Sequence, residues 1–155
     1  RFEMIKGSKV IANHMKSGLN PTDFITLSYD DRFRRRIVMK TDGGEEFLLD
    51  LFHATELRSG DLIKLENGKY VEVKAASEKL MRATSKDPLL ILKAAWHIGN
   101  RHLSCEIQKG SLILRFDHVI MQMLENLGLT LEVITQPFNP EGGAYGESRT
   151  TGHKH

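Results

Sequence analysis

Hydrophobic residues in the first half of the chain form short runs that are separated by turn signals. Four of these runs form two pairs, which cover residues 32–40 with 46–51 and residues 62–65 with 70–74. Asp42-Gly43 lies between the first pair and Asn67-Gly68 between the second. Such dipeptides favour tight hairpin turns, because glycine readily adopts the positive φ that these turns require. The pattern therefore predicts short strands in a small barrel or sandwich.

The spacing of the hydrophobic residues changes in the second half of the chain. Pro88 follows the capping candidates Ser85 and Asp87, and apolar residues then recur with helical spacing at Leu89, Leu92, Ala95, Trp96 and Gly99. A second helix is predicted between Asp117, which can cap its start, and Gly128, which can end it. Runs that predict strands cover residues 79–83, 105–108, 111–116 and 129–134. The order strand, helix, strand, strand, helix, strand is that of a ferredoxin-like domain.

The last residues of the chain have a different composition. From Pro137 onward glycine and polar residues dominate, and they cannot bury enough apolar surface to order the segment by themselves. We therefore predict an α+β protein with three parts. These are an N-terminal all-β domain over residues 1–75, a ferredoxin-like βαββαβ domain over residues 76–138 and a flexible C-terminal tail over residues 139–155.

The composition of the 155 residues restricts the functional classes. A hydrophobic content of 40% and a charged content of 27% are typical of a globular protein. The formal net charge of +2 argues against a dedicated nucleic-acid binder, which usually carries a strong positive excess. The longest apolar runs are too short to cross a membrane, and a single cysteine suits a reducing compartment. We expect a cytoplasmic protein that binds neither nucleic acid nor membranes.

Common enzyme motifs are missing from the sequence. It contains no P-loop, no His-Glu-x-x-His pair, no Gly-x-Ser-x-Gly elbow and no four-cysteine zinc framework. These absences weaken the usual enzyme interpretations, and we expect a binding protein without catalytic activity.

Histidines supply the strongest candidate chemistry, because neutral imidazole is the commonest protein ligand for nickel, zinc and copper. His102 follows the first predicted helix. His97 lies about 140° from it around an ideal helix and is interpreted as structural. A helix-end histidine often interacts only with the last carbonyls of its helix. In a two-fold symmetric dimer, however, one His102 near the axis would meet its own copy.

The tail holds a second pair of imidazoles. His153 and His155 flank one residue, so an extended chain points both side chains to the same side. Ligands on a flexible segment lose entropy when they bind, which suits capture and release of a metal ion better than permanent retention. His118, at the start of the second predicted helix, is a candidate auxiliary ligand. Cys105 is interpreted as a small buried apolar side chain.

A run of arginines lies in the first half of the chain. In a strand, Arg32, Arg34 and Arg36 share one face. A solvated face or a patch for an acidic protein partner is the favoured interpretation.

Several motifs agree in order with those of one known family. In the second half these are Gly99-Asn100-Arg101-His102, Asp117-His118-Val119 and Pro137-Phe138-x-Pro140-Glu141-Gly142-Gly143-Ala144-Tyr145. In the first half they include Arg34-x-Arg36, Asp42-Gly43, Leu49-Asp50-Leu51 and Leu57-Arg58-x-Gly60-Asp61. With these motifs the chain resembles the urease accessory protein E family of nickel metallochaperones over nearly its whole length.

The resemblance implies a homodimer that delivers Ni²⁺ to apo-urease together with a partner GTPase and other accessory proteins. It implies that the N-terminal β domain binds partner proteins and that the ferredoxin-like domain binds metal. It places the family's nickel ligand at the dimer interface on His102, and the tail ligands that complete the site on His153 and His155. The same imidazoles would accept Zn²⁺ or Cu²⁺.

Two alternatives from other functional classes stay open on the sequence. A metal-dependent hydrolase would use His102, His118 and an acid, and it needs a preformed pocket with an open metal position. A metal-independent adaptor would only dock a protein through its β domain and its arginine face.

Overall fold

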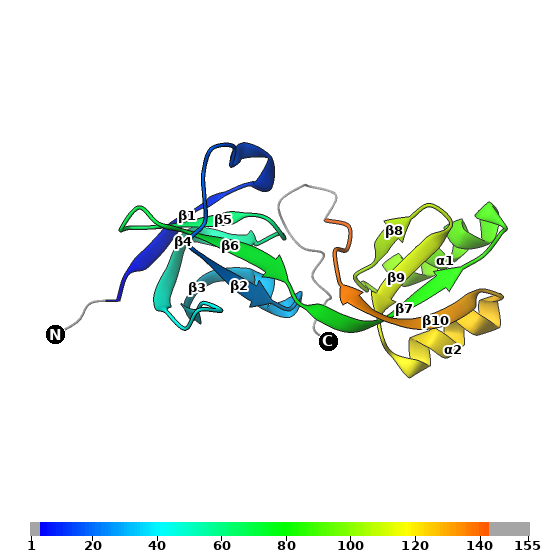
Figure 1. Cartoon of the computed structure of the whole chain (residues 1–155). Helices are drawn as coiled ribbons and strands as arrows, with labels where there is room; N and C mark the ends of the chain where they lie inside the picture. The colour runs from blue at the N-terminus through cyan, green and yellow to red at the C-terminus, as the bar shows by residue number, and fades with distance from the viewer. Residues whose placement is uncertain (1–3, 143–155) are drawn as a thin grey trace. The chain divides into compact units, whose positions relative to one another are not determined.

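The computed structural model describes residues 4–142 of the chain (Figure 1). The chain divides into two compact units, Arg1–Ala76 and Ser77–His155. No helix in the described part of the chain is long and apolar enough to cross a membrane.

The first unit is built on one sheet of six strands with the order β2-β6-β5-β1-β4-β3. Its elements are β1 (Lys6–Ile11), η1 (Asn13–Met15), β2 (Asp23–Leu27), η2 (Asp30–Arg32), β3 (Phe33–Lys40), β4 (Glu46–Glu56), β5 (Leu62–Leu65) and β6 (Tyr70–Ala75), where η marks a short 3₁₀ helix. Strands β3 and β4 pair antiparallel, as do β5 and β6, so both predicted hairpins are confirmed.

The core of the first unit follows from alternation along its strands. In β4 the side chains of Phe47, Leu49 and Leu51 are buried, whereas the residues between them face outward to different degrees. In β6 Val71 and Val73 are buried in the same way. Because successive side chains of a strand point to opposite faces, one face of the sheet surrounds a common core and the other is accessible to solvent.

Hydrogen bonds at Asp42 connect the two outer strands of this sheet. The Asp42 amide donates to the Phe24 carbonyl of β2 at 2.8 Å, and the Thr26 amide of β2 donates to the Asp42 carboxylate at 3.1 Å. Asp42 lies in the turn between β3 and β4. These bonds therefore hold β2 beside that turn in a curled sheet. The nearby Asp23 carboxylate accepts hydrogen bonds from the Thr41 side chain and from backbone amides, which lower the pKa of its carboxyl group.

Strand β1 was not predicted from the sequence pattern. It lies between β4 and β5, parallel to the first and antiparallel to the second. Gly7 permits this close packing, because a Cβ atom there would lie 2.8 Å from the Ile63 side chain.

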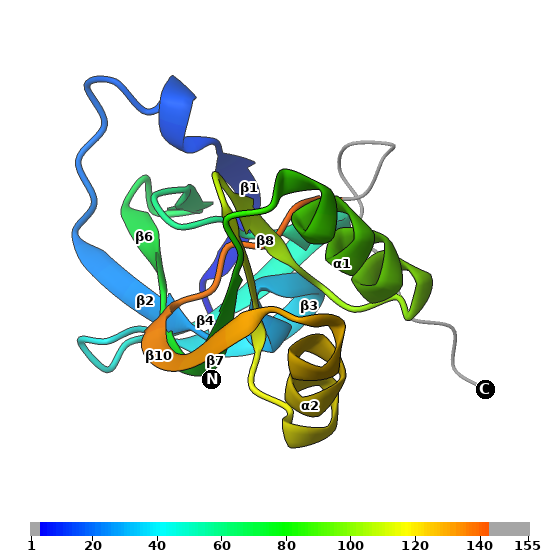
Figure 2. The ribbon, with the colours of Figure 1, turned by 90° about the vertical axis from the view of Figure 1, so that its right-hand side faces the viewer.

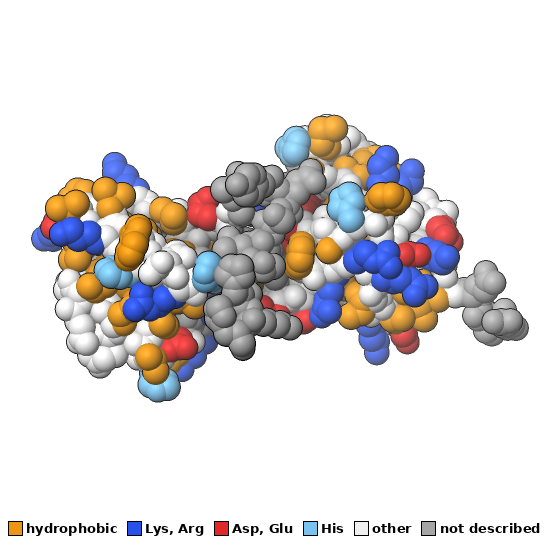
Figure 3. All heavy atoms as spheres, turned by 180° about the vertical axis from the view of Figure 1, so that it is seen from behind, with side chains coloured by type: hydrophobic (Ala, Val, Ile, Leu, Met, Phe, Trp, Pro, Cys, Tyr) orange, Lys and Arg blue, Asp and Glu red, His pale blue; other side chains and the backbone are white. Residues whose placement is uncertain are grey.

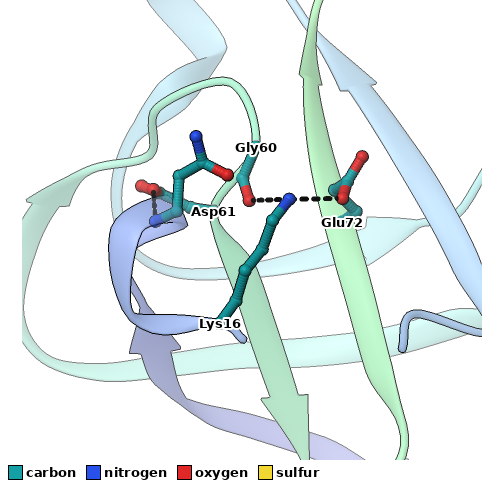
Figure 4. Close-up of polar contacts among 5 residues, drawn as sticks. Lys16, Gly60, Asp61 and Glu72 are labelled. Carbon is teal, nitrogen blue, oxygen red and sulfur yellow. Dashed lines mark hydrogen bonds and ion pairs between the residues drawn. The ribbon is translucent and has the colours of Figure 1, made fainter. Parts of the chain in front are cut away.

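The connection from β1 to β2 is tied to the sheet by buried polar contacts (Figure 4). The Asp61 side chain is 7% exposed, and its carboxylate accepts hydrogen bonds from the backbone amides of Asn13 and Arg58 at 3.0 and 2.8 Å. The Lys16 ammonium donates to the Gly60 carbonyl at 2.9 Å and pairs with Glu72 at 2.8 Å. The Asp61 carboxylate thus connects the segment that follows β1 with the segment that follows β4.

The second unit contains β7 (Ser77–Thr84), α1 (Pro88–Asn100), β8 (Glu106–Gln108), β9 (Ser111–Arg115), α2 (His118–Leu127) and β10 (Thr130–Pro137). The predicted order of strands and helices is confirmed. All neighbours in the sheet, whose order is β10-β7-β9-β8, run antiparallel. Both helices pack on one face of the sheet (Figure 2), where Met81, Ala83, Leu112, Leu114, Ala94, Ile98 and Leu124 form one buried cluster.

Local signals set the ends of both helices as predicted. The Asp87 side chain accepts from the Leu89 amide at the start of α1. The Asp117 side chain accepts from two amides at the start of α2, and Gly128 ends that helix at φ 109°. A carboxylate cap satisfies amides that have no partner within the helix, and glycine takes the left-handed conformation with little strain.

Most of the apolar residues whose spacing predicted helix α1 lie outside its buried side. Leu89, Leu92 and Trp96 have the helical spacing that identified it, yet they are 55%, 66% and 65% exposed. The buried side is formed by Ala94 and Ile98. Helical periodicity identifies a helix but does not say which of two apolar sides packs on the sheet.

We predict that Asp61→Ala lowers the free energy of unfolding by about 1–3 kcal/mol, because two partly buried amides lose their acceptor. The matched control is Glu72→Gln, which weakens a partly exposed ion pair and should cost less than about 1 kcal/mol. Urea unfolding followed by circular dichroism measures both values. Equal losses in the two variants would contradict the role assigned to Asp61.

Candidate metal centre

His102 occupies a constrained position just after α1. The helix ends at Asn100, and the His102 amide donates to the Gly99 carbonyl at 3.0 Å. The backbone of His102 has φ 57°, and no other non-glycine residue in the range 4–142 has a positive φ. A left-handed residue ends the helix and turns the chain, and it costs a non-glycine residue about 1–2 kcal/mol. The turn leaves the His102 side chain exposed.

The end of α1 also offers a favourable electrostatic setting for a cation. The last carbonyls of a helix carry a partial negative charge, and His102 follows them directly. The Arg101 guanidinium already uses one of them, since it donates to the His97 carbonyl at 3.2 Å. A metal ion held by His102 would lie near this negative end of the helix.

The exposed side of α1 runs toward His102. Leu89, Leu92 and Trp96 fall within an arc of about 60° on the helix, on the side opposite the core residues Ala94 and Ile98. Figure 3 shows hydrophobic and histidine side chains at the surface of the second unit, on the left of that view. Helix α1 is therefore apolar on two opposite sides.

His97 and His118 line one hollow between α1 and α2. The hollow has a volume of about 620 Å³, and Arg101, Val119, Gln122, Met123, Asn126 and Leu127 also line it. The Trp96 and His97 rings meet edge to face with their centroids 5.2 Å apart. Sequence reasoning set His97 aside because it compared positions on α1 alone. No signal in the sequence revealed that α2 would bring His118 to the same hollow.

The described part of one chain does not gather a full set of metal ligands. Among residues 4–142, no three His, Cys, Asp or Glu side chains form a group that could hold a metal ion. His102 is not among the residues that line the hollow with His118. The predicted tail ligands His153 and His155 lie outside the described residues.

Cys105 precedes β8 and is largely buried. Its Sγ contacts the Glu106 carbonyl at 3.7 Å, and its own carbonyl accepts from the Glu141 amide at 2.9 Å. Burial raises the pKa of the Cys105 thiol to about 12, and the nearby charges of Glu106 and Glu141 act in the same direction. A metal-binding cysteine must lose its proton, so Cys105 fits the predicted apolar role better than a ligand role.

The predicted shared face of Arg32, Arg34 and Arg36 is wrong. Arg32 lies in η2, before β3, and is 1% exposed. Its guanidinium donates to the Leu27 carbonyl at 3.2 Å and lies 5.6 Å from the Tyr29 ring centroid. Arg34 and Arg36 both lie in β3, whose pairing with β4 shifts in register between them. Arg34 pairs with Asp31 at 2.7 Å and Arg36 with Asp50 at 3.5 Å.

Comparison with known proteins covers both units. The model of the UreE urease accessory protein N-terminal domain matches residues 8–76, and the C-terminal domain model matches residues 78–155. The chain belongs to the UreE family. The UreE urease accessory protein of Cereibacter sphaeroides is 50% identical over 84% of this chain and 70% of its own length. That of Ruegeria pomeroyi is 49% identical over 86% of this chain and 87% of its own length. That of Chelativorans sp. (strain BNC1) is 45% identical over 98% of this chain and 94% of its own length.

The end of helix α1 lies within the part of the chain that matches the UreE family. Both the strained residue His102 and the exposed side of α1 lie within the region that the C-terminal UreE model matches. The family resemblance inferred from the sequence motifs is therefore confirmed over residues 8–76 and 78–155.

The raised pKa of Cys105 predicts low reactivity of its thiol. At pH 8 the fraction of thiolate should be at least about a hundredfold lower in the folded protein than in the unfolded chain. Iodoacetamide labelling followed by mass spectrometry should therefore be slow without denaturant and fast in urea. Rapid labelling of the folded protein would contradict the burial of this thiol.

Proposed function

We propose that the chain is a nickel-binding metallochaperone that delivers Ni²⁺ to apo-urease during maturation of the urease active site. Membership of the UreE family supports the connection to urease. The observation that carries the metal-binding part is the position of His102, exposed and backbone-constrained at the negative end of α1. In this proposal nickel is cargo, and the protein is a carrier and not an enzyme.

A homodimer supplies the second ligand in this proposal. A site built on His102 needs ligands beyond those that residues 4–142 of one copy bring together. A two-fold axis beside the C-terminal end of α1 would place the two His102 side chains near each other. The exposed Leu89, Leu92 and Trp96 support this arrangement, because exposed apolar patches commonly mark protein interfaces.

The tail completes the site in the same proposal. His153 and His155 would close over the ion from the part of the tail that follows Glu141. The predicted flexible tail of residues 139–155 is wrong at its start, because the amides of Asn139 and Glu141 donate to Glu106 and to the Cys105 carbonyl. Nitrogen and oxygen ligands suit Ni²⁺, and they also accept Zn²⁺ or Cu²⁺. Metal selectivity would then come partly from the partner proteins. His118 would serve as an auxiliary ligand at the hollow that it shares with His97.

The two units have different tasks in this proposal. Residues 76–138 form a ferredoxin-like domain for metal binding and dimerisation, and the strand order β10-β7-β9-β8 supports that assignment. Residues 1–75 form the domain that binds partners in the cytoplasm, namely the urease accessory GTPase and the complex of apo-urease with its accessory proteins. The predicted docking role of Arg34 and Arg36 belongs to this domain.

The alternatives have less support. A hydrolase that used His102 and His118 together would need both at one cavity, but the hollow beside α2 is lined by His118 and not by His102. A metal-independent adaptor would not use the exposed His102 side chain. The nickel measurements below separate the adaptor from the metallochaperone.

We predict that His102→Ala lowers nickel affinity by at least about a hundredfold. Loss of an outer-shell partner alone costs about 10–100-fold in metal affinity, and loss of a ligand should cost no less. A chain that ends at Thr151 should bind nickel more weakly but remain a dimer. Isothermal titration with Ni²⁺ measures both variants, with His53→Ala, an exposed histidine in the first unit, as the control. Unchanged affinity in the first two variants would exclude this site.

The dimer prediction rests on the exposed side of α1. Trp96→Glu places a charge in the centre of the proposed interface and should convert the dimer to a monomer in size-exclusion chromatography with light scattering. The control is Ile107→Glu on β8, since Ile107 is also a half-exposed apolar residue of the second unit. A dimeric Trp96→Glu variant would place the interface elsewhere.

A further inference from the structure

Strand β4 contains a large bulge opposite Arg35. Arg34 pairs with Thr55 and Arg36 pairs with Asp50. Between these two pairs β3 has one residue, Arg35, whereas β4 has four, residues 51–54. Bulges change the direction of side chains and are common beside functional sites.

Hydrogen bonds keep this bulge in one shape. The Arg35 guanidinium donates to the Leu51 carbonyl at 3.4 Å, and the Thr55 hydroxyl donates to the His53 carbonyl at 2.9 Å. The Leu51 side chain is packed in the core of the first unit at 5% exposure. The backbone of the bulge is therefore hydrogen-bonded near both of its ends.

The outward side chain of the bulge is Phe52, which is 96% exposed. Within the described part of the chain it is the most exposed of the large hydrophobic side chains. Its ring makes an edge-to-face contact with the His53 ring, at 5.9 Å between centroids. Folding gains almost nothing from an aromatic ring in this position. Aromatic side chains exposed at a surface are frequent anchors of protein interfaces.

The charge next to Phe52 indicates what kind of partner fits. Arg34 and Arg36 pair with carboxylates, whereas the hydrogen bond that the structure gives the exposed Arg35 goes to the backbone beside Phe52. An arginine in that setting can still donate to a carboxylate of another molecule. A matching surface would combine an apolar pocket with an acidic residue at its rim.

We propose that Phe52 and Arg35 form a docking epitope for a protein of the urease maturation complex. Phe52 inserts into an apolar pocket of that protein, and Arg35 pairs with a carboxylate at the rim of the pocket. The identity of the complex rests on the proposed function, but the epitope itself rests on the bulge. The preformed shape of the bulge reduces the entropy lost on binding.

Biolayer interferometry with the full-length protein and purified complex of apo-urease with its accessory proteins tests this epitope. Phe52→Ala should weaken binding at least tenfold, and Arg35→Gln should weaken it about threefold to tenfold and reduce its dependence on salt. Met15→Ala is the matched control, because Met15 is a 68% exposed apolar residue of the same unit. Thermal unfolding of Phe52→Ala should match that of the natural sequence.

Several results would overturn the epitope. Binding of Phe52→Ala within twofold of the natural sequence, or no binding by either protein, would do so. A Phe52-dependent change in oligomeric state would assign the epitope to a second copy of the chain. Phe52-dependent binding to phosphatidylcholine–phosphatidylserine vesicles, without an effect on the complex, would assign it to lipid.

Nickel titration of the Phe52→Ala variant separates this epitope from the proposed metal site. Nickel stoichiometry should be unchanged, because Phe52 and His102 belong to different units. If the natural sequence bound no nickel but still docked through Phe52, the metallochaperone proposal would fail and the epitope would stand.

Discussion

Helix α1 is apolar on two opposite sides, and the second unit is organised by this constraint. Ala94 and Ile98 supply the side that packs against the sheet, and Leu89 and Trp96 lie on the other. A helix with this composition is normally surrounded by protein. The described part of one chain covers only the first side, so the proposed dimer is the arrangement that gives the second side a function. The same helix then ends at His102, whose left-handed backbone turns the chain so that Leu103 packs against the same core.

Local signals in the sequence were sufficient to predict both helices and the two hairpins of the first unit. Asp87, Asp117 and Gly128 act on backbone groups within four residues of themselves, so their effects could be predicted without a fold. The hairpin turns at Asp42-Gly43 and Asn67-Gly68 are local in the same sense. Strand β1 was missed because its sequence has a weak pattern and its partners, β4 and β5, lie far along the chain.

The candidate site was less predictable, because neighbours on other elements decide the role of a side chain. The sequence pattern predicts Arg32 as an exposed strand residue. In the structure it lies in η2 and is buried beside Tyr29. The sequence predicts a structural role for His97. In the structure α2 brings His118 to the same hollow. His102 could be selected from the sequence by its motif. Its positive φ could not, since histidine tolerates that conformation less readily than glycine.

Local rules of folding are broken in the two places to which we assign function. His102 adopts a backbone conformation that disfavours non-glycine residues, and Phe52 exposes an aromatic ring on a bulge that interrupts the β3–β4 pairing. The His102 conformation also ends α1, whereas the exposed Phe52 ring gains almost nothing from the folding of its unit. In natural proteins such isolated departures concentrate at functional sites. The two departures lie in different units, so the proposed metal site and the proposed docking epitope are built on separate hydrophobic cores.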